Sequence, residues 1–374
     1  MTVIYLDNAA TEKPDSIALF KAMPYLQDFY GNASSLHPMG TRAREAVEAA
    51  RAKIKTHLHC KDHDVIFTSG ATESNNVAIL SNHSKGEWIY SVFEHSSARP
   101  SVADPAHTIP ATERGQIDCD ALEDMLKGGN VKLVSACYVS NYLGTVQPVM
   151  RISDLCHRYG AVFHCDATQA VGKLPIDIDG FDKIDILTFS GHKFGGIKGT
   201  GCVVARPGLI KKIFFGGKQE SNVRPGTENV FGIVAMSSAL VNASYNLVDN
   251  YTRVDHLKRK FISLLESRFG TVVKPHVMTS PYILTLHCTN TRAETLHSLL
   301  RDSVCFSTGS ACEGSAALTH PNTAVMAMGH SKEYALNTFR VSFSALTEES
   351  DIEEAAEIFN AATFCQKTCA AVSV

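Results

Sequence analysis

Ser190-Gly191-His192-Lys193-Phe194-Gly195-Gly196 is the most informative stretch of this 374-residue chain, because it places a lysine in a glycine-rich turn. The apolar run from Ile184 to Phe189 directly before it predicts a buried strand. A lysine at the end of such a strand is partly removed from water, which disfavours its ammonium form. The neutral amine is the form that makes a Schiff base with an aldehyde. Taken alone, the segment fits a surface lysine in a loop about equally well.

Strand-like runs on both sides of this turn alternate with helix-like segments. Further strands are expected at Val65 to Thr68, Trp88 to Phe93, Val131 to Val139, Ala161 to Cys165 and Cys202 to Ala205. The spacing of Val47, Ala50, Ile54 and Leu58 predicts an amphipathic helix from Arg42 to Leu58. Near-continuous apolar strands separated by helices are typical of a mostly parallel sheet covered on both faces. The sequence therefore predicts an α/β fold.

A second, smaller unit is predicted towards the C-terminus, and the chain is long enough for two domains. Helices are expected at Tyr251 to Phe269, Arg292 to Leu300 and Glu348 to Phe359, with strands at Tyr282 to Leu286 and Arg340 to Phe343. We expect a large domain over residues 14–247. Residues 1–13 and 248–374 are expected to form a smaller α+β domain.

Composition limits the function classes. The net charge is -3 with His neutral, so no general affinity for nucleic acid or for an anionic membrane is expected. No apolar run approaches the ~20 residues that span a bilayer. The eleven cysteines include no CxxC pair, which favours reduced thiols in the cytoplasm. Cys365 and Cys369 lie four residues apart without a second ligand pair, so no metal site is expected there.

Two other strand ends carry polar residues that suit a cofactor. Asp166, in His164-Cys165-Asp166-Ala167-Thr168-Gln169, ends an apolar run where an open α/β sheet has its binding crevice. A carboxylate there can pair with the protonated ring nitrogen of pyridoxal phosphate (PLP), and Gln169 could bond the ring oxygen. The alternative is that Asp166 caps the helix that follows.

A phosphate site is predicted at Thr68-Ser69-Gly70-Ala71-Thr72-Glu73-Ser74-Asn75, where a strand turns at a glycine into a helix. The exposed N–H groups and the dipole of a helix start attract an anion, and Thr72 adds a hydroxyl. An ordinary helix start is the alternative. The segment matches neither GxGxxG nor GxxxxGK[ST].

Motifs spread along most of the chain show a resemblance to the class V aminotransferase fold and, within it, to the NifS/IscS-like cysteine desulfurases. They are Tyr5 to Thr11, Gly31 to Ser34, Thr68 to Glu73, Asp166 to Gln169, Val171 to Asp177, Ser190 to Lys193, Arg224 to Asn229 and Ser307 to Cys312. The resemblance implies the PLP-dependent transferase fold (fold type I), with PLP as the cofactor and L-cysteine as the substrate.

The resemblance also implies a role for each matching residue. Lys193 carries PLP, Asp166 pairs with the ring nitrogen, Gln169 bonds the ring oxygen, and His95 stacks on the ring and serves in acid/base chemistry. The expected phosphate contacts are Ala71, Thr72, Ser190 and His192, together with Thr227 of the partner subunit in a homodimer. Asn141 is expected near the ring oxygen and the substrate carboxylate, which Arg340 clamps bidentately.

Cys312 is the expected sulfur acceptor, because small residues precede it in Ser307-Thr-Gly-Ser-Ala-Cys312 and leave the thiol accessible. The implied reaction leaves L-alanine and a persulfide on Cys312, which passes its outer sulfur to an acceptor protein. Some positions depart from the family pattern. Tyr142 stands where a Glu commonly follows the Asn, and Ser344 and Ala345 replace the usual Gly and basic residue.

Two other functions stay open at this point. One is a different reaction of the same fold, such as selenocysteine lysis, another C–S lyase reaction or transamination. The other is a weakly catalytic scaffold that docks sulfur-carrier partners, which is motivated by the departures near Arg340 and near Cys312, where Glu313 adjoins the thiol. The acceptor pathway is also open among iron–sulfur assembly, tRNA thiolation and DNA phosphorothioation.

Overall fold

The structure is a computed structural model that describes residues 3–83, 86–100, 104–274, 276–309 and 320–371, with side chains to residue 362. Its helices are α1 (Ser16–Ala22), α2 (Pro24–Gln27), α3 (Pro38–His57), α4 (Ala71–Asn82), α5 (Cys119–Lys127), α6 (Val149–Tyr159), α7 (Gln219–Val223), α8 (Val230–Tyr245), α9 (Leu247–Leu264), α10 (Ala293–Leu300), α12 (Thr323–Ala327), α13 (Lys332–Leu336) and α14 (Glu349–Ala371). Its strands are β1 (Ile4–Tyr5), β2 (Asp64–Thr68), β3 (Glu87–Ser91), β4 (Thr108–Ile109), β5 (Val131–Cys137), β6 (Val162–Asp166), β7 (Ile186–Ser190), β8 (Gly201–Ala205), β9 (Phe269–Thr271), β10 (Ile283–Cys288), β11 (Val304–Cys305) and β12 (Thr338–Ser342).

The main sheet has seven strands in the order β2-β8-β7-β6-β5-β3-β4. Strands β3 to β7 pair in parallel, whereas β8 is antiparallel to both β7 and β2. The predicted α/β fold with a mostly parallel sheet is therefore confirmed. The reversal of β8 has a simple cause, because parallel neighbours need a crossover of a dozen or more residues. The link of residues 191–200 is too short for one.

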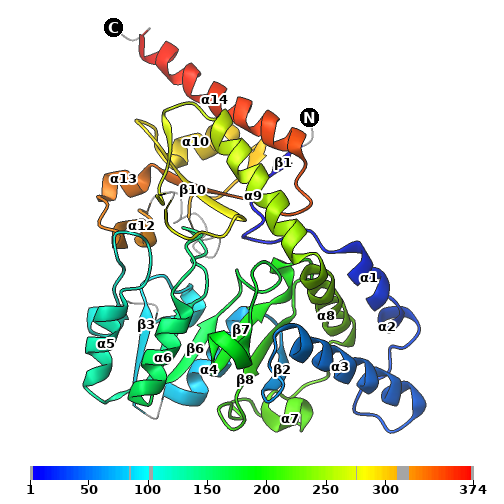
Figure 1. Cartoon of the computed structure of the whole chain (residues 1–374). Helices are drawn as coiled ribbons and strands as arrows, with labels where there is room; N and C mark the ends of the chain where they lie inside the picture. Colours follow the sequence, from blue (N-terminus) through cyan, green and yellow to red (C-terminus); the bar gives the residue numbers. More distant parts are fainter. Residues whose placement is uncertain (1–2, 84–85, 101–103, 275, 310–319, 372–374) are drawn as a thin grey trace.

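Both faces of this sheet are buried, and successive residues of each strand take opposite sides. Phe67 and Val204 face the core that α3, α6 and α8 cover. Ile66 and Val203 face a second core, which contains Val77 from α4. Figure 1 shows α3 and α8 together at one side of the lower layer.

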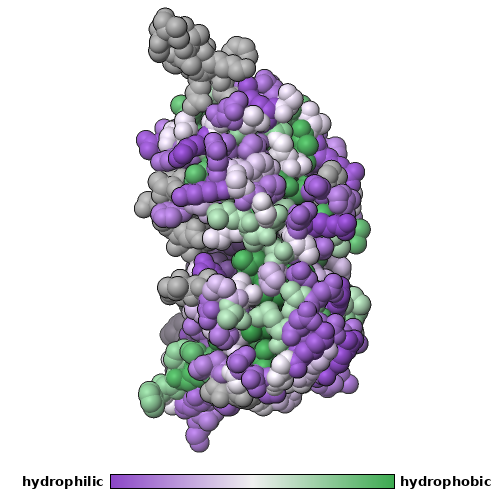
Figure 2. Space-filling model, turned by 90° about the vertical axis from the view of Figure 1, so that its left-hand side faces the viewer, coloured by the Kyte–Doolittle hydropathy of each residue, from purple (hydrophilic) through white to green (hydrophobic). Residues whose placement is uncertain are grey.

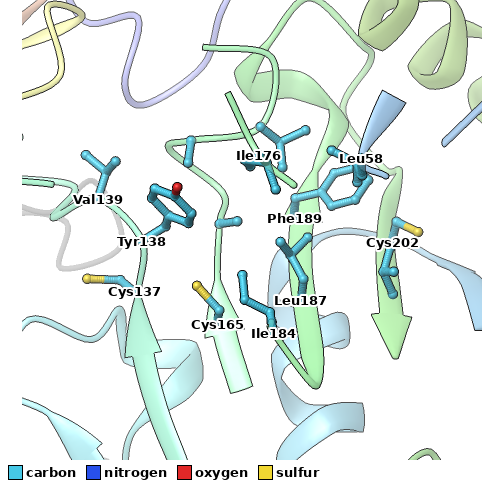
Figure 3. Packing of buried hydrophobic residues seen from close by; sticks show 14 of the residues in the cluster. Leu58, Cys137, Tyr138, Val139, Cys165, Ile176, Ile184, Leu187, Phe189 and Cys202 are labelled. Atoms are coloured by element: carbon cyan, nitrogen blue, oxygen red, sulfur yellow. The ribbon is translucent and has the colours of Figure 1, made fainter. Parts of the chain in front are cut away.

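Cysteines take part in this packing. Figure 3 shows Cys137, Cys165 and Cys202, from β5, β6 and β8, among apolar side chains such as Phe189. Their exposures of 5%, 0% and 0% show that these three cysteines are small core residues. The cysteines whose side chains the structure describes are all unpaired. Cys365 and Cys369 lie outside the described side chains.

The upper part of Figure 1 is built on a separate core. Strands β12, β10 and β9 form an antiparallel sheet, and β1 pairs in parallel with β11. Ile4 and Leu6 share one cluster with Phe261, Phe339 and Phe359, although they come from the other end of the chain. The helix expected from Tyr251 to Phe269 ends at Leu264, because Leu265 is extended and Phe269 pairs with Cys288 in the sheet.

The surface is mixed. Figure 2 shows hydrophilic residues over much of one face, with hydrophobic residues gathered mainly across its middle and at its lower edge. Among the described residues, no single helix is both long and apolar enough to cross a membrane. Helices α8 and α9 reach that length and hydropathy only as a pair, and the pair is bent by 76°.

Candidate active site

A cavity of about 430 Å³ lies where β6 and β7 end. It brings together all but two of the predicted site residues, namely Ala71, Thr72, His95, Asn141, Asp166, Gln169, Ser190, His192, Lys193 and Arg340. Thr227 instead lines a neighbouring cavity of about 140 Å³ beside Ser69 and Arg224. Cys312 lies outside the described residues.

Lys193 enters the cavity from a single helical turn (Gly191–Lys193) that directly follows β7. Its ammonium donates to the carbonyl oxygens of Ala9 at 2.8 Å and Ala10 at 2.7 Å. The N-terminal segment thus crosses the cavity and contacts the lysine. Sequence reasoning assigned no role to these carbonyl groups, because backbone acceptors leave no trace in residue identity.

Asp166 ends β6 and is 7% exposed. Its Oδ2 accepts from Asn75 Nδ2 at 2.8 Å, and its Oδ1 accepts from the backbone N–H of Thr168 at 3.0 Å. The bond from the Thr168 N–H resembles the helix cap that was the alternative role for Asp166. The bond from Asn75 does not, because Asn75 comes from α4 and holds the carboxylate at the cavity wall.

Gln169 and Thr168 carry buried polar atoms that have no hydrogen-bond partner within the described protein. Gln169 Nε2 donates to Ala9 O at 2.9 Å, whereas its Oε1 has no partner. Thr168 Oγ1 is likewise buried without one. Orphaned polar atoms of this kind are costly unless a ligand satisfies them. Both residues line the cavity, so both can serve a polar ring substituent.

The predicted phosphate end of the cavity lies at the start of α4. Gly70 precedes this helix with φ 156°, and no side chain caps its first N–H groups. A Cβ on Gly70 would lie 3.6 Å from Ser190 Oγ, so this hydroxyl stands beside the turn. Ala71 and Thr72 complete an arrangement that suits a phosphate.

The two histidines of the cavity are held by hydroxyl groups. His192 Nδ1 lies 3.1 Å from Thr11 Oγ1, and burial, followed by the charge of Lys193, lowers the pKa of His192 to about 4. His192 is therefore neutral near pH 7. His95 Nδ1 lies 2.7 Å from Ser97 Oγ and also accepts the backbone N–H of Ser97 at 3.2 Å.

Arg340 in β12 is 2% exposed and closes the cavity from the upper part. Its Nη1 donates to Asn141 O at 2.7 Å and its Nη2 to Asp7 Oδ1 at 2.7 Å. Its Nε is buried and has no hydrogen-bond partner within the described protein. The guanidinium is therefore buried and is not a solvated charge at the start of a strand.

Several residues that support the site escaped the sequence analysis. Tyr142 was noted only as a departure from a family pattern, yet its hydroxyl lies within hydrogen-bond distance of Thr308 O, at 3.2 Å, and of Thr338 O, at 3.0 Å. It therefore ties the start of the segment that leads to Cys312. Asn75 lies one helical turn after Ala71 and so on the same face of α4, which could have indicated its place at the cavity.

The donor set suits PLP. The cavity combines an amine, a buried carboxylate, unpartnered acceptors and an uncapped helix start, which match the aldehyde, ring nitrogen, ring hydroxyl and phosphate of that cofactor. Within the described residues, no group of three or more His, Cys, Asp or Glu side chains is placed to hold a metal ion. Site and sheet together define a PLP-dependent transferase of fold type I.

Comparison with known proteins places the chain more closely. Residues 4–354 match the family model described as Aminotransferase class-V, and the chain belongs to this PLP-dependent family. It is 33% identical to the cysteine desulfurase of Sinorhizobium fredii over 96% of both proteins. It is 34% identical to the cysteine desulfurase IscS of Dictyoglomus turgidum, over 93% of this chain and 91% of that one. The crystal structure of a NifS-like protein from Rickettsia africae matches it with a TM-score of 0.86 at 29% identity, over 97% of this chain and 99% of that one.

Proposed function

We propose that this chain is a cysteine desulfurase, which takes the sulfur from L-cysteine, releases L-alanine and leaves a persulfide on Cys312. The observation that carries the proposal is the meeting of Lys193, Asp166 and Arg340 at one cavity, each on a different element. Full-length relatives that bear the name cysteine desulfurase support this substrate over others.

The cofactor, when bound, withdraws electrons from the substrate Cα and thereby eases proton removal there. Lys193 would anchor it through its amine and would then take and return the Cα proton. Asp166 would keep the ring nitrogen protonated, and Gln169 and Thr168 would bind the ring oxygen. The start of α4, with Ser190 and His192, would hold the phosphate.

Arg340 is assigned to the substrate carboxylate, with the carbonyl of Asn141 fixing the plane of the guanidinium. Binding of L-cysteine would add a carboxylate to a guanidinium that already bonds Asp7 and has an unpartnered Nε. A carboxylate on a buried arginine orients the substrate and excludes water from the reacting carbon.

The sulfur step balances without an external oxidant. The Cys312 thiolate attacks the substrate sulfur, the S–S bond forms, and the Cβ–S bond breaks. The electron pair of that bond, with protons from the protein, completes the methyl group of L-alanine. A reduced thiol at Cys312 is required, which supports a cytoplasmic location. We leave the acceptor open among the three pathways named above.

A homodimer and a two-domain chain are part of the proposal. Phe20, Leu36 and Phe215 are 79%, 94% and 105% exposed, and a partner subunit that covered them would remove this apolar surface from water. In the dimer, Thr227 of the partner subunit would reach the phosphate. We keep the boundaries at residues 14–247 for the large domain and 1–13 with 248–374 for the small one. Light scattering of the purified protein tests the dimer.

The test of the activity is L-cysteine turnover with detection of L-alanine and of protein-bound persulfide, for wild type, Lys193→Ala and Cys312→Ala. Wild type should be yellow and active, and Lys193→Ala should be inactive. Cys312→Ala should bind L-cysteine, with a changed visible spectrum, but form no persulfide.

The other open functions give different outcomes. Full sulfide release by Cys312→Ala would favour a simple lyase, and normal processing of selenocysteine by that variant would favour a selenocysteine lyase. A colourless wild type that ignores added PLP would overturn the proposal and leave a docking scaffold.

A further inference from the structure

Behind Asp166 lies a row of polar side chains that the reaction does not use. It consists of Asn75, Thr188, His164, Ser135 and Glu94, which come from α4, β7, β6, β5 and the residues after β3. Glu94 is 5% exposed, and the other four are 0% exposed. Five buried polar side chains in contact need a consistent set of donors and acceptors, because an unsatisfied one is costly.

The hydrogens at the Asp166 end can be assigned by counting. Asn75 Nδ2 donates to Asp166 Oδ2 at 2.8 Å and to Ser97 Oγ at 2.9 Å, so its Oδ1 is the acceptor. Thr188 Oγ1 donates to that Oδ1. The single hydroxyl proton of Thr188 is then used, and its oxygen must accept from His164 Nε2 at 3.0 Å.

The same count continues to Glu94. Burial lowers the pKa of His164 to about 4, so its ring is neutral and carries its one proton on Nε2. His164 Nδ1 therefore accepts from Ser135 Oγ at 2.9 Å. Ser135 has no second proton for Glu94 Oε2, which lies 3.5 Å away. Glu94 Oε1 already accepts from Cys137 N at 2.6 Å and from Ser91 Oγ at 2.9 Å.

We propose that Glu94 is a neutral acid that donates from Oε2 to Ser135, and that the chain from Glu94 to Asn75 holds Asp166 as a carboxylate facing the cofactor ring. Glu94 and Asn75 are then positioning residues, which act through Asp166. This inference rests on the proposed function, in which Asp166 pairs with the ring nitrogen.

The surroundings of Glu94 support its neutral form. Burial, followed by the negative charge of Asp166, raises the pKa of Glu94 to about 8. The other titratable groups that face it are Cys137 on β5 and Cys165 and His164 on β6. Burial raises the pKa of both thiols well above the usual value, so neither adds a charge near pH 7.

Asn75 extends the chain to a second ring residue. Ser97 Oγ accepts from Asn75, and His95 Nδ1 accepts the backbone N–H of Ser97, so the Ser97 hydroxyl donates to His95 Nδ1 at 2.7 Å. The proton of a neutral His95 is thereby placed on Nε2. One amide thus fixes both the carboxylate assigned to the ring nitrogen and the tautomer of the histidine assigned to the ring face.

The experiment measures the dissociation constant of PLP at pH 7.5 from its visible absorbance, after removal and return of the cofactor. Thr188→Val and Glu94→Leu should weaken PLP binding at least tenfold, because each breaks the chain that ends on Asp166. Glu94→Gln should stay within about threefold of wild type, since its amide accepts at Oε1 and donates from Nε2. Thr145→Val is the matched control. Thr145 is a buried threonine whose hydroxyl donates to Gly115 O and takes no part in the row of hydrogen bonds from Glu94 to Asp166.

A pH series separates this role from a structural one. Between pH 7 and 9.5, wild type should lose more PLP affinity than Glu94→Gln does, because only the acid can ionise beside Asp166. The inference is overturned, while the proposed function stands, if Glu94→Gln binds PLP as weakly as Glu94→Leu. The same holds if Thr188→Val binds PLP as tightly as the control Thr145→Val. A wild type without any PLP band overturns the proposed function and this inference together.

Discussion

Asp7 Oδ1 accepts a hydrogen bond from Arg340 Nη2 over 2.7 Å, although the two residues lie at opposite ends of the chain. The side chain of Arg340 is 3% exposed and that of Asp7 is 20% exposed. The pair therefore fixes the arginine assigned to the substrate carboxylate and joins the N-terminal segment to β12.

Arg340→Lys should lower kcat/KM for L-cysteine at least 100-fold, because a lysine offers no planar pair of donors. PLP affinity should change little, since the assigned cofactor contacts remain. Steady-state alanine release and a PLP titration measure the two effects. Arg253→Lys is the control, as Arg253 binds Ala345 O at the surface. Equal loss of PLP affinity and turnover in Arg340→Lys would contradict the assignment.

Asp7→Asn should destabilise the fold by about 2 kcal/mol, because it leaves a buried guanidinium without its countercharge while Asp7 itself is partly solvated. The KM for L-cysteine should rise as the guanidinium loses its orientation. Urea unfolding and alanine release measure both. An unchanged KM with lowered stability would limit Asp7 to a structural role.

Gly201→Ala tests the phosphate end of the cavity. Gly201 in β8 pairs with Thr68 and Ser190, and a Cβ there would lie 2.5 Å from Gly70 Cα. The methyl group must displace the turn before α4, so PLP affinity should fall about tenfold. The free energy of unfolding should fall by about 1–3 kcal/mol, because the added methyl group overpacks the core. Gly270→Ala in β9 is the matched control, because a Cβ there meets nothing within 4 Å. Wild-type PLP affinity in Gly201→Ala would show that the phosphate binds elsewhere.

The sequence predicted the parts of the site that follow a local rule. Lys193 and Asp166 each end an apolar run, so their meeting at one edge of the sheet followed from strand direction. The Asp7–Arg340 pair could not be predicted from the residues alone, because nothing local links positions 333 apart. The chain from Glu94 to Asn75 was missed for a similar reason. Each member looks like an ordinary polar residue in or beside a strand or helix, and the hydrogen count needs the contacts.

For the fold, as for the site, the sequence predicted the features that follow a local rule and missed the others. The runs of apolar residues predicted six of the seven strands of the main sheet to within a few residues and missed the two-residue strand β4. They did not predict that β8 runs against its neighbours, because periodicity carries no direction. The length of the link between Phe189 and Cys202 did carry that information. The end of α9 was also missed, since Phe269 continues the apolar pattern but pairs in β9 instead.

Glu94 predicts a pH dependence of stability. Its pKa rises from 4.5 to about 8 on folding, so the folded state holds a proton that the unfolded state loses between these values. The stabilisation is complete below about pH 4.5 and disappears as the pH rises through about 8, at a slope of up to ~1.4 kcal/mol per pH unit. Glu94→Gln should remove this slope. Urea unfolding of both proteins from pH 5 to 9 measures it, and parallel curves would show that Glu94 is ionised when folded.

Lys173 and Glu12 form a buried ion pair. Their side chains are only 3% and 12% exposed and lie 3.4 Å apart. Burial lowers the pKa of Lys173 and raises that of Glu12, so removal from water outweighs the attraction within the pair. Glu12→Gln should destabilise by roughly 3–5 kcal/mol, because it leaves a buried ammonium unpaired. Glu12→Leu combined with Lys173→Met should restore most of that loss, since neither side chain then needs a countercharge. Urea unfolding of Glu12→Leu, Lys173→Met and their double variant gives the coupling energy. Additive losses in the double variant would mean that each residue stabilises the fold through other contacts.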